Sequence, residues 1–135
     1  MAAITAETFN EMIRLVPLAH HLGIRADSLK RGEARLVMPF GPGLSRPVNV
    51  VSGPALMTLA DVALWAVVLS AIGPIEMAVT TSMTTNFLRK AEGCDIIAEA
   101  RLLKLGRRLA VGAMEMVDAG SDEMVAYATG SYAIP

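Results

Sequence analysis

The stretch from Ala55 to Ile72 constrains the fold more than any other part of the chain, because it predicts a long helix without a polar face. Strong helix formers fill it without an internal breaker, and Gly73-Pro74 ends it. Its apolar side chains fall on every side of the helix rather than along one stripe. A helix of this kind must be surrounded by protein.

This apolar helix is better explained as a buried helix than as a membrane span. Asp61 interrupts it, and the uncharged run Val62–Ile75 is shorter than the ~18 residues that a span needs. The N-terminus lacks the basic start and apolar core of a signal peptide. The single cysteine, Cys94, cannot form an internal disulfide, which fits a reducing compartment. We therefore expect a cytoplasmic protein with no membrane partner.

Size and charge narrow the class of protein further. A chain of 135 residues is expected to form one domain, spanning residues 1–135, and to bury a real core. Its net charge of −1 provides no electrostatic footprint for nucleic acid. Its hydrophobic content of 53% is high for so short a chain, which suggests that part of its surface is hidden against a partner subunit.

The rest of the sequence predicts a short N-terminal helix and a sheet. Residues 5–16 predict the helix, which Thr5 can cap and Pro17 ends. A loop rich in Gly and Pro covers residues 40–51. Six strands are predicted: Leu22–Lys30, Glu33–Pro39, Ala78–Leu88, Asp95–Leu105, Leu109–Val117 and Met124–Ile134. Short turns join the last four, which predicts a four-stranded antiparallel meander.

One face of the last strand is suited to close contact with a helix. Ala126, Ala128 and Gly130 alternate along it and carry almost no side chain. A long buried helix and six antiparallel strands predict an α+β architecture in which the sheet wraps around the helix.

Asp61 is the first candidate functional residue, because an ionised carboxylate in an apolar helix is costly unless something compensates it. It either faces a crevice or pairs structurally with an Arg, or it is kept in a site because chemistry needs it. The helix start favours chemistry. Free N–H groups at Gly53 and Ala55, with the helix dipole, suit negative charge developing on an oxygen, and Gly53 lets a carbonyl approach closely. The alternative is that Ser52-Gly53-Pro54 is simply a good helix cap.

A family resemblance supports the functional interpretation. The run from Ser52 to Asp61, SGPALMTLAD, resembles the HGG-A-L-x-x-L-A-D signature of the phenylacetate-pathway and hydroxybenzoyl-CoA types of hotdog-fold thioesterase. Four later segments agree in order: NFLRKA at 86–91, AEAR at 98–101, GRRLA at 106–110 and ATG at 128–130. The likeness covers roughly residues 20–134. It implies the hotdog fold, with a six-stranded antiparallel sheet wrapped around a central helix at about residues 53–72, and hydrolysis of an acyl-CoA thioester.

Three catalytic roles follow from the resemblance, position by position. The amide of Gly53 corresponds to the group that polarises the thioester carbonyl. Asp61 corresponds to the carboxylate that attacks this carbonyl or activates water. Thr80 falls where some relatives place a hydroxyl that holds the water.

The sequence also departs from the signature. Ser52 replaces a common His, and Pro54 replaces the second Gly, which removes one donor N–H. Arg46 stands where relatives often have Gln or Asn, and Asn49 lies nearby but out of register. Trp65 stands where some members carry Ser or Thr, so it forms a wall of the acyl pocket or simply belongs to the core. We keep Ser52, Asn49 and Trp65 as candidate substrate-binding residues.

Four basic residues at strand ends are candidates for the coenzyme A phosphates. They are Arg89, Lys90, Arg107 and Arg108. The resemblance places such positions near those phosphates, for which Arg and Lys are natural donors, whereas each alone is explained equally well as a solvated turn charge.

Other chemistries find little support. His20 and His21 would diverge in a strand and have no third ligand at suitable spacing, so no metal is expected. Cys94 begins a strand without an obvious catalytic partner and is expected to be an inert thiol. A serine hydrolase is not supported, because no G-x-S-x-G is present.

We therefore expect an acyl-CoA thioesterase that needs no cofactor, since coenzyme A is part of its substrate. One alternative is a non-catalytic acyl-CoA-binding hotdog protein, and a weaker one is a hotdog dehydratase or hydratase. Gly53 and Asp61 are eight residues apart, about 12 Å along a helix axis, so they can hardly meet at one carbonyl. Antiparallel helices of a two-fold homodimer would join them across the interface, and a dimer of dimers is the expected assembly.

Overall fold

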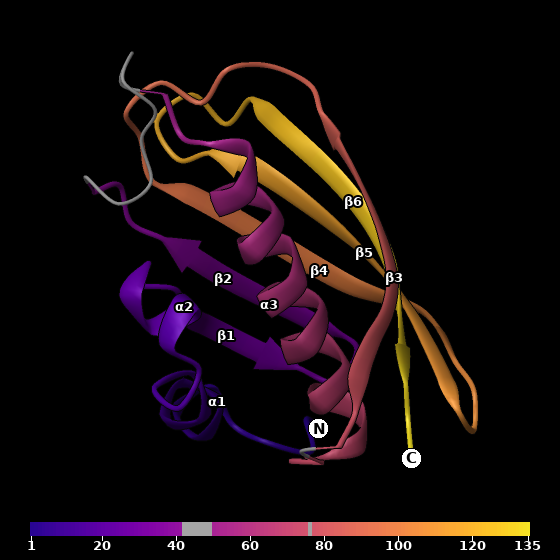
Figure 1. Ribbon diagram of the computed structural model, residues 1–135. Helices are drawn as coiled ribbons and strands as arrows, with labels where there is room; N and C mark the ends of the chain where they lie inside the picture. Colours follow the sequence, from indigo (N-terminus) through magenta and orange to yellow (C-terminus); the bar gives the residue numbers. More distant parts are fainter. Residues whose placement is uncertain (42–49, 76) are drawn as a thin grey trace.

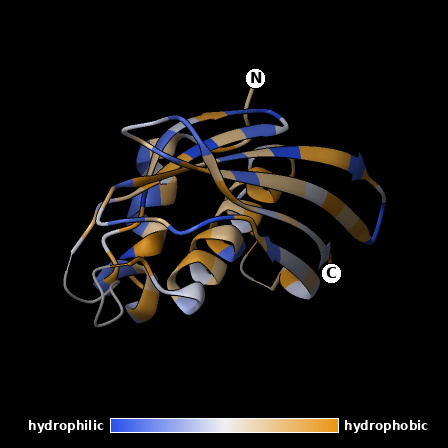
Figure 2. Cartoon of the chain, turned by 90° about the horizontal axis from the view of Figure 1, so that it is seen from above, coloured by the Kyte–Doolittle hydropathy of each residue, from blue (hydrophilic) through white to orange (hydrophobic). Residues whose placement is uncertain are grey.

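The computed structural model describes residues 1–41, 50–75 and 77–135. Over this part of the chain it contains α1 (Ala6–Ile13), α2 (Pro17–His21), β1 (Arg25–Lys30), β2 (Glu33–Met38), α3 (Gly53–Ile72), β3 (Val79–Phe87), β4 (Ile96–Leu105), β5 (Leu109–Asp118) and β6 (Met124–Ala133). One curved sheet wraps around α3, with α1 and α2 beside β1 (Figure 1). Seen from above, the sheet forms one layer and the helices the other (Figure 2). The predicted α+β architecture is confirmed.

The strand order corrects one prediction. All neighbours are antiparallel, in the order β1-β2-β4-β5-β6-β3. Only β4, β5 and β6 form a meander, so the predicted four-stranded meander is wrong. Strand β4 pairs with β2 along one edge and with β5 along the other, so β3 cannot pair with it. Strand β3 instead pairs with β6 and forms an edge of the sheet.

Close approach between α3 and the sheet depends on two facing glycines. Gly112 of β5 and Gly130 of β6 are paired in register, and Leu64 of α3 lies over both. A Cβ on Gly112 would come within 2.9 Å of one Leu64 methyl, and a Cβ on Gly130 within 2.8 Å of the other. The prediction that this face accommodates a close helix is confirmed.

Both ends of α3 are well capped. The Ser52 hydroxyl accepts a hydrogen bond from the Ala55 N–H at 3.3 Å, as an N-cap residue should. At the other end Gly73 adopts a φ of 89°, which few other residues tolerate. The β1–β2 turn also contacts this end, because the Arg31 guanidinium donates to the Ala71 carbonyl at 3.1 Å. A cation there complements the negative end of the helix dipole.

The N-terminal region differs from the prediction. The expected helix over residues 5–16 ends at Ile13, and a second helix, α2, begins at Pro17. Proline is favoured in a first helical turn because it has no N–H to satisfy there. His20 and His21 therefore lie in α2 and not in a strand. Strand β1 correspondingly begins at Arg25 rather than Leu22.

One side of α3 faces away from the sheet and is incompletely covered. Helix α3 is long and apolar enough to span a membrane by composition, but most of it is buried in the core. The residues on its outer side include Pro54, Met57, Asp61 and Trp65, and Met57 is 45% exposed. Among the described residues of one chain, no layer comparable to the sheet packs over this side of the helix (Figure 1).

The contact at Leu64 predicts that Gly130→Ala destabilises the fold. Its new methyl group would also lie 3.0 Å from the Ser82 carbonyl oxygen, which belongs to the backbone and cannot move alone. We expect a loss of about 1–3 kcal/mol in the free energy of unfolding, measured by urea denaturation. Gly41→Ala is the control, because a Cβ there meets no atom of the described residues within 4 Å. Equal stability of both variants would contradict the packing argument.

Candidate active site

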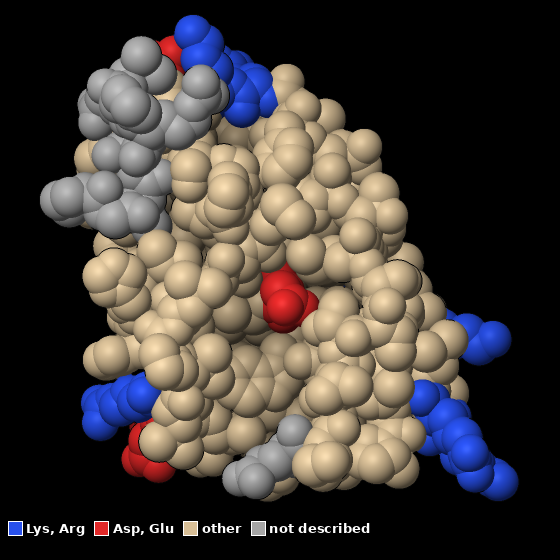
Figure 3. Space-filling view, viewed as in Figure 1, with Lys and Arg blue, Asp and Glu red and all other residues tan. Residues whose placement is uncertain are grey.

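Asp61 is the only charged residue of α3, and a side chain from β3 supports it. The Thr80 hydroxyl donates a hydrogen bond to Asp61 Oδ1 at 2.6 Å. One acidic group is visible in the middle of the otherwise uncharged face over α3 (Figure 3). Among the described residues, no ion pair involves Asp61. A carboxylate that is partly exposed and held by a hydroxyl is suited to act on a bound molecule.

A β-bulge aims Thr80 at this carboxylate. Met83 and Thr85 point inward along β3. If the alternation continued towards the start of the strand, Thr81 would also point inward. The register between β3 and β6 shifts between Thr80 and Ser82, so Thr81 is the extra residue. Thr80 therefore occupies the inner face, opposite Tyr132 of β6. Bulges often re-aim a side chain beside a functional site in this way.

Tyr132 belongs to the same cluster, although sequence reasoning did not identify it. It is 6% exposed, lies opposite Thr80 in the pairing of β3 with β6, and is close enough to Asp61 to sense its charge. Burial raises the pKa of Tyr132 to about 12, and the Asp61 charge adds to the rise. The alternation of Ala126, Ala128 and Gly130 already placed residue 132 on the helix-facing side, so this signal was available in the sequence.

At the N-terminus of α3, one of the two backbone donors expected to be free is already occupied. The Ala55 N–H is occupied by the Ser52 hydroxyl, and Pro54 has no N–H. For the Gly53 N–H, the described residues provide no acceptor. The ring of Phe87 lies about 3.6 Å from where a Gly53 side chain would begin, so an approaching group would also contact this ring.

A pocket of about 300 Å³ opens beside Gly53. The end of β3 and the segment before α3 line it, with the residues Val50, Val51, Gly53, Leu56, Phe87, Leu88, Arg89, Lys90 and Ala91. Two of the four predicted phosphate-binding residues, Arg89 and Lys90, are therefore near the helix N-terminus. Arg89 also forms an ion pair with Glu123.

The other two basic residues lie elsewhere. Arg107 and Arg108 occupy the turn between β4 and β5, which projects from the end of the sheet opposite to the N-terminus of α3 (Figure 1). One chain thus does not bring all four together. Gly53 and Asp61 are likewise separated by about 12 Å along α3. Asn49 and Arg46 lie outside the described residues.

Trp65 stands one turn beyond Asp61 on the outer side of α3. Its ring contacts the buried Phe9 edge-on, with centroids 4.7 Å apart and an angle of 61° between the planes. Because Trp65 is only partly buried, it packs on the core and presents a surface beside Asp61.

The remaining candidates show no sign of reactivity. Burial raises the pKa of the Cys94 thiol to about 11, and Asp118 adds to this through a hydrogen bond and its charge. Such a thiol is almost entirely protonated near neutral pH. Across the described ranges, the acidic, His and Cys side chains form no cluster of three or more that could hold a metal.

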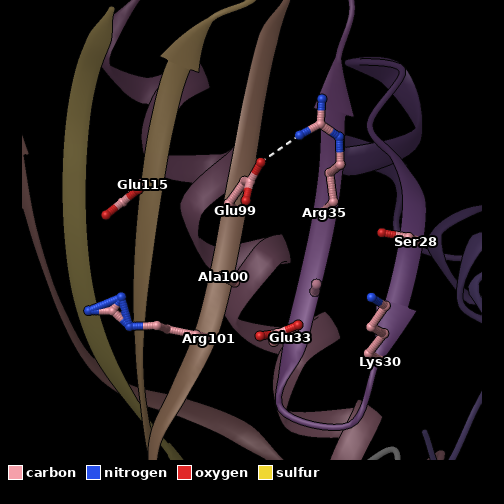
Figure 4. Close-up of a pocket in the computed structure, with 9 residues that line it drawn as sticks. Ser28, Lys30, Glu33, Arg35, Glu99, Ala100, Arg101 and Glu115 are labelled. Atoms are coloured by element: carbon pink, nitrogen blue, oxygen red, sulfur yellow. Dashed lines mark hydrogen bonds and ion pairs between the residues drawn. The ribbon is translucent and has the colours of Figure 1, made fainter. Parts of the chain in front are cut away.

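A second pocket lies on the outer face of the sheet, away from α3. Charged side chains of β1, β2, β4 and β5 surround it, and they spread along the strands instead of converging on one point (Figure 4). Arg35 there contacts Glu99 and also pairs with Asp27 at 3.4 Å. These three side chains are 40–58% exposed, which is typical of a solvated ionic surface.

The curved antiparallel sheet wrapped around one long helix is the hotdog fold. The family model described as "Thioesterase superfamily" matches residues 48–125, which include Asp61, Thr80 and the whole of α3. This protein belongs to the thioesterase superfamily.

Individual relatives agree with this assignment. A candidate thioesterase from Silicibacter sp. TM1040 is 36% identical and superimposes with a TM-score of 0.89, covering 100% of this chain and 94% of that one. A variant of the phenylacetic acid degradation protein PaaI from Thermus thermophilus is 27% identical, with a TM-score of 0.79 over 88% of this chain and 99% of that one. A candidate esterase from Saccharolobus solfataricus is 23% identical over 97% of this chain and 86% of its own length.

Proposed function

We propose that this protein is an acyl-CoA thioesterase of the phenylacetate-pathway or hydroxybenzoyl-CoA type, which hydrolyses an acyl- or aryl-CoA to the free acid and coenzyme A. The observation that carries the proposal is Asp61, a single carboxylate on the apolar helix of a thioesterase-superfamily chain, held by the Thr80 hydroxyl at 2.6 Å. Thioester hydrolysis needs a base or nucleophile of this kind, and it needs no metal or redox cofactor.

The proposed chemistry uses one backbone donor and one carboxylate. The thioester carbonyl oxygen accepts a hydrogen bond from the Gly53 N–H, and the positive end of α3 stabilises the charge that develops there. Asp61 either takes a proton from the attacking water or attacks the carbonyl carbon itself, and Thr80 holds the water in place. In either route a C–O bond forms, the C–S bond breaks, and coenzyme A leaves as a thiolate that is then protonated. If water attacks, the free acid forms directly; if Asp61 attacks, the product is a short-lived anhydride, which water hydrolyses to release the acid and restore Asp61.

The substrate would occupy the surface between the two ends of this arrangement. The pocket at Gly53 would accept the thioester arm, and Trp65 would contact the acyl group. Ser52 and Asn49 are proposed as further substrate-binding residues. Arg89 and Lys90 on one side, and Arg107 and Arg108 on the other, would bind the phosphates of coenzyme A.

A homodimer would bring these separated groups together, and a dimer of dimers would extend it. Two features support the homodimer. The outer side of α3 is partly uncovered and apolar, and the edge strand β3 carries neither a charge nor a proline to discourage pairing. With two antiparallel α3 helices, Gly53 and Lys90 of one protomer approach Asp61 and Arg107 of its partner. This arrangement would complete two equivalent sites.

Asp61→Asn tests the catalytic assignment, because it keeps the shape of the side chain and removes its negative charge. Hydrolysis of a panel of straight-chain and aromatic acyl-CoA thioesters, followed by release of the thiol, should fall by about 10²–10⁴-fold or more. Asp122→Asn is a matched control, because this exposed turn residue has a φ of 59°, which Asn also adopts. Near-normal turnover by Asp61→Asn would end the assignment. A wild-type protein that binds but does not hydrolyse any thioester would instead be an acyl-CoA-binding protein.

The basic residues predict a difference between two substrates. Neutralising Lys90, Arg89, Arg107 and Arg108 should raise KM for an acyl-CoA more than it lowers kcat, because the phosphates are bound equally before and during reaction. The same variants should hardly affect the pantetheine thioester of the same acyl group, which lacks the nucleotide. Equal effects on both substrates would mean that these charges are surface residues unrelated to binding.

Mixing two inactive variants tests the shared site. Gly53→Pro removes the N–H donor, and proline is compatible with the first helical position. In a mixed dimer with Asp61→Asn, one site carries both defects and the other carries none. Random re-pairing should therefore restore roughly a quarter of wild-type activity, provided that each variant folds and dimerises. A mixture that stays inactive would show that both groups act from one chain.

A further inference from the structure

The outer side of α3 gives Asp61 two unlike neighbours. Met57 precedes it and Trp65 follows it, each by four residues, so both lie beside the carboxylate, about 6 Å away along the helix axis. Met57 is 45% exposed, and its unbranched side chain adapts to what it contacts. Trp65 is only partly exposed and packs against the core. A group bound at Asp61 therefore meets a yielding surface on one side and a bulky ring on the other.

Phe9 of α1 fixes the orientation of that ring. It is fully buried, and its ring lies edge-on to Trp65 with the centroids 4.7 Å apart. Aromatic rings in this arrangement attract each other beyond the area that they bury, because the edge of one ring is positive and the face of the other is negative. The indole of Trp65 cannot turn without losing this contact.

Helix α1 is itself held in place on either side of Phe9. The Ala3 N–H donates a hydrogen bond to the Ser70 carbonyl at 2.7 Å, which ties the start of the chain to the last turns of α3. The Asn10 amide donates to the Ala26 carbonyl at 3.0 Å, and its oxygen accepts from the Ala26 N–H at 2.6 Å. These bonds join α1 to β1 directly beside Phe9 (Figure 1). The aromatic pair therefore rests on a fixed support.

We propose that Phe9 is a positioning residue that determines substrate specificity, because it holds the Trp65 indole as a wall one turn beyond Asp61. This inference rests on the proposed thioesterase function. A short acyl group fits between the carboxylate and the indole, whereas a long straight chain that runs along α3 must displace the ring. Close packing against the core resists such a displacement. Phe9 lies in the core and acts through Trp65, so it selects the acyl group without touching it.

Selectivity for chain length tests the inference. The wild type should hydrolyse butyryl-CoA with a higher kcat/KM than decanoyl-CoA. Phe9→Leu removes the ring but keeps an apolar side chain, so the indole gains room to turn. The ratio of kcat/KM for decanoyl-CoA to that for butyryl-CoA should then rise by about tenfold or more, which is what a small gain of room in an apolar pocket is worth. Ile13→Val is the matched control, because it trims the other buried residue of α1 and leaves the aromatic pair intact.

A double-mutant cycle separates positioning from a general loosening of the fold. Trp65→Leu removes the wall and should raise the same ratio by itself. If Phe9 acts through Trp65, adding Phe9→Leu to Trp65→Leu should raise the ratio no further. Independent effects would multiply instead.

Fluorescence tests the support of the ring without any turnover. Trp65 is the only tryptophan of the chain, so the intrinsic fluorescence reports on this ring alone. Phe9→Leu should make the indole more mobile and lower its fluorescence anisotropy, whereas Ile13→Val should leave the anisotropy unchanged. Phe9→Met replaces Phe9→Leu in both experiments if the latter does not fold, as judged by thermal melting, because it keeps most of the volume and loses the ring.

Four results would overturn the inference. They are a wild type that hydrolyses decanoyl-CoA as well as butyryl-CoA, a Phe9→Leu variant with an unchanged ratio, a control Ile13→Val that changes the ratio equally, and a double variant whose effects multiply. An unchanged anisotropy in Phe9→Leu would likewise show that Phe9 does not hold the indole.

The outcome for Asp61 separates this inference from the proposed function. If Asp61→Asn is inactive while Phe9→Leu keeps the wild-type ratio, Asp61 is still catalytic and only the role of Phe9 is wrong. If Asp61→Asn is active, or the wild type hydrolyses none of the thioesters, the proposed function fails and the role of Phe9 in specificity fails with it.

Discussion

The rest of the structure depends on the close packing of α3 against the curved sheet. A helix with apolar residues on every side must be covered, and Leu64 seated over Gly112 and Gly130 sets how closely the sheet can approach. A side chain at either glycine would clash with Leu64 and disturb the packing that holds α3, and with it Asp61, against the sheet. The site therefore depends on two residues that are themselves not part of it.

This packing also explains why a lone carboxylate is tolerated on such a helix. Asp61 lies on the side of α3 that faces away from the sheet, so it keeps contact with solvent. Thr80 reaches it from the neighbouring strand only because β3 contains a bulge. A charge at position 64, pressed on the two glycines, would instead have to be desolvated without compensation.

The N-terminus and the middle of α3 provide different parts of the proposed chemistry, and their separation is a consequence of helix geometry. Gly53 begins the helix and Asp61 lies two turns further on, so a rigid helix keeps them about 12 Å apart. The uncharged edge of β3 and the uncovered side of α3 lie on the same part of the molecule as Asp61. A second copy that covers this surface would bury apolar area and complete the site in one step, which is why assembly and catalysis are tested together.

The sequence by itself determined the elements and the principal candidate residues of this protein. The long helix, its Ser52 cap and Gly73 end, the alternating face of β4 and the single carboxylate all depend on residues a few positions apart, and such local patterns can be read directly. Only the tertiary structure decided which strands are neighbours, that Pro17 begins α2, that the Ala55 N–H is taken by Ser52, and that Tyr132 lies opposite the threonine that holds Asp61. The last of these requires a pairing between residues about fifty positions apart and a one-residue bulge that changes which threonine points inward. The physical reason is that alternation along a strand is local, whereas register and strand order depend on the partner strand and on the core that both must cover.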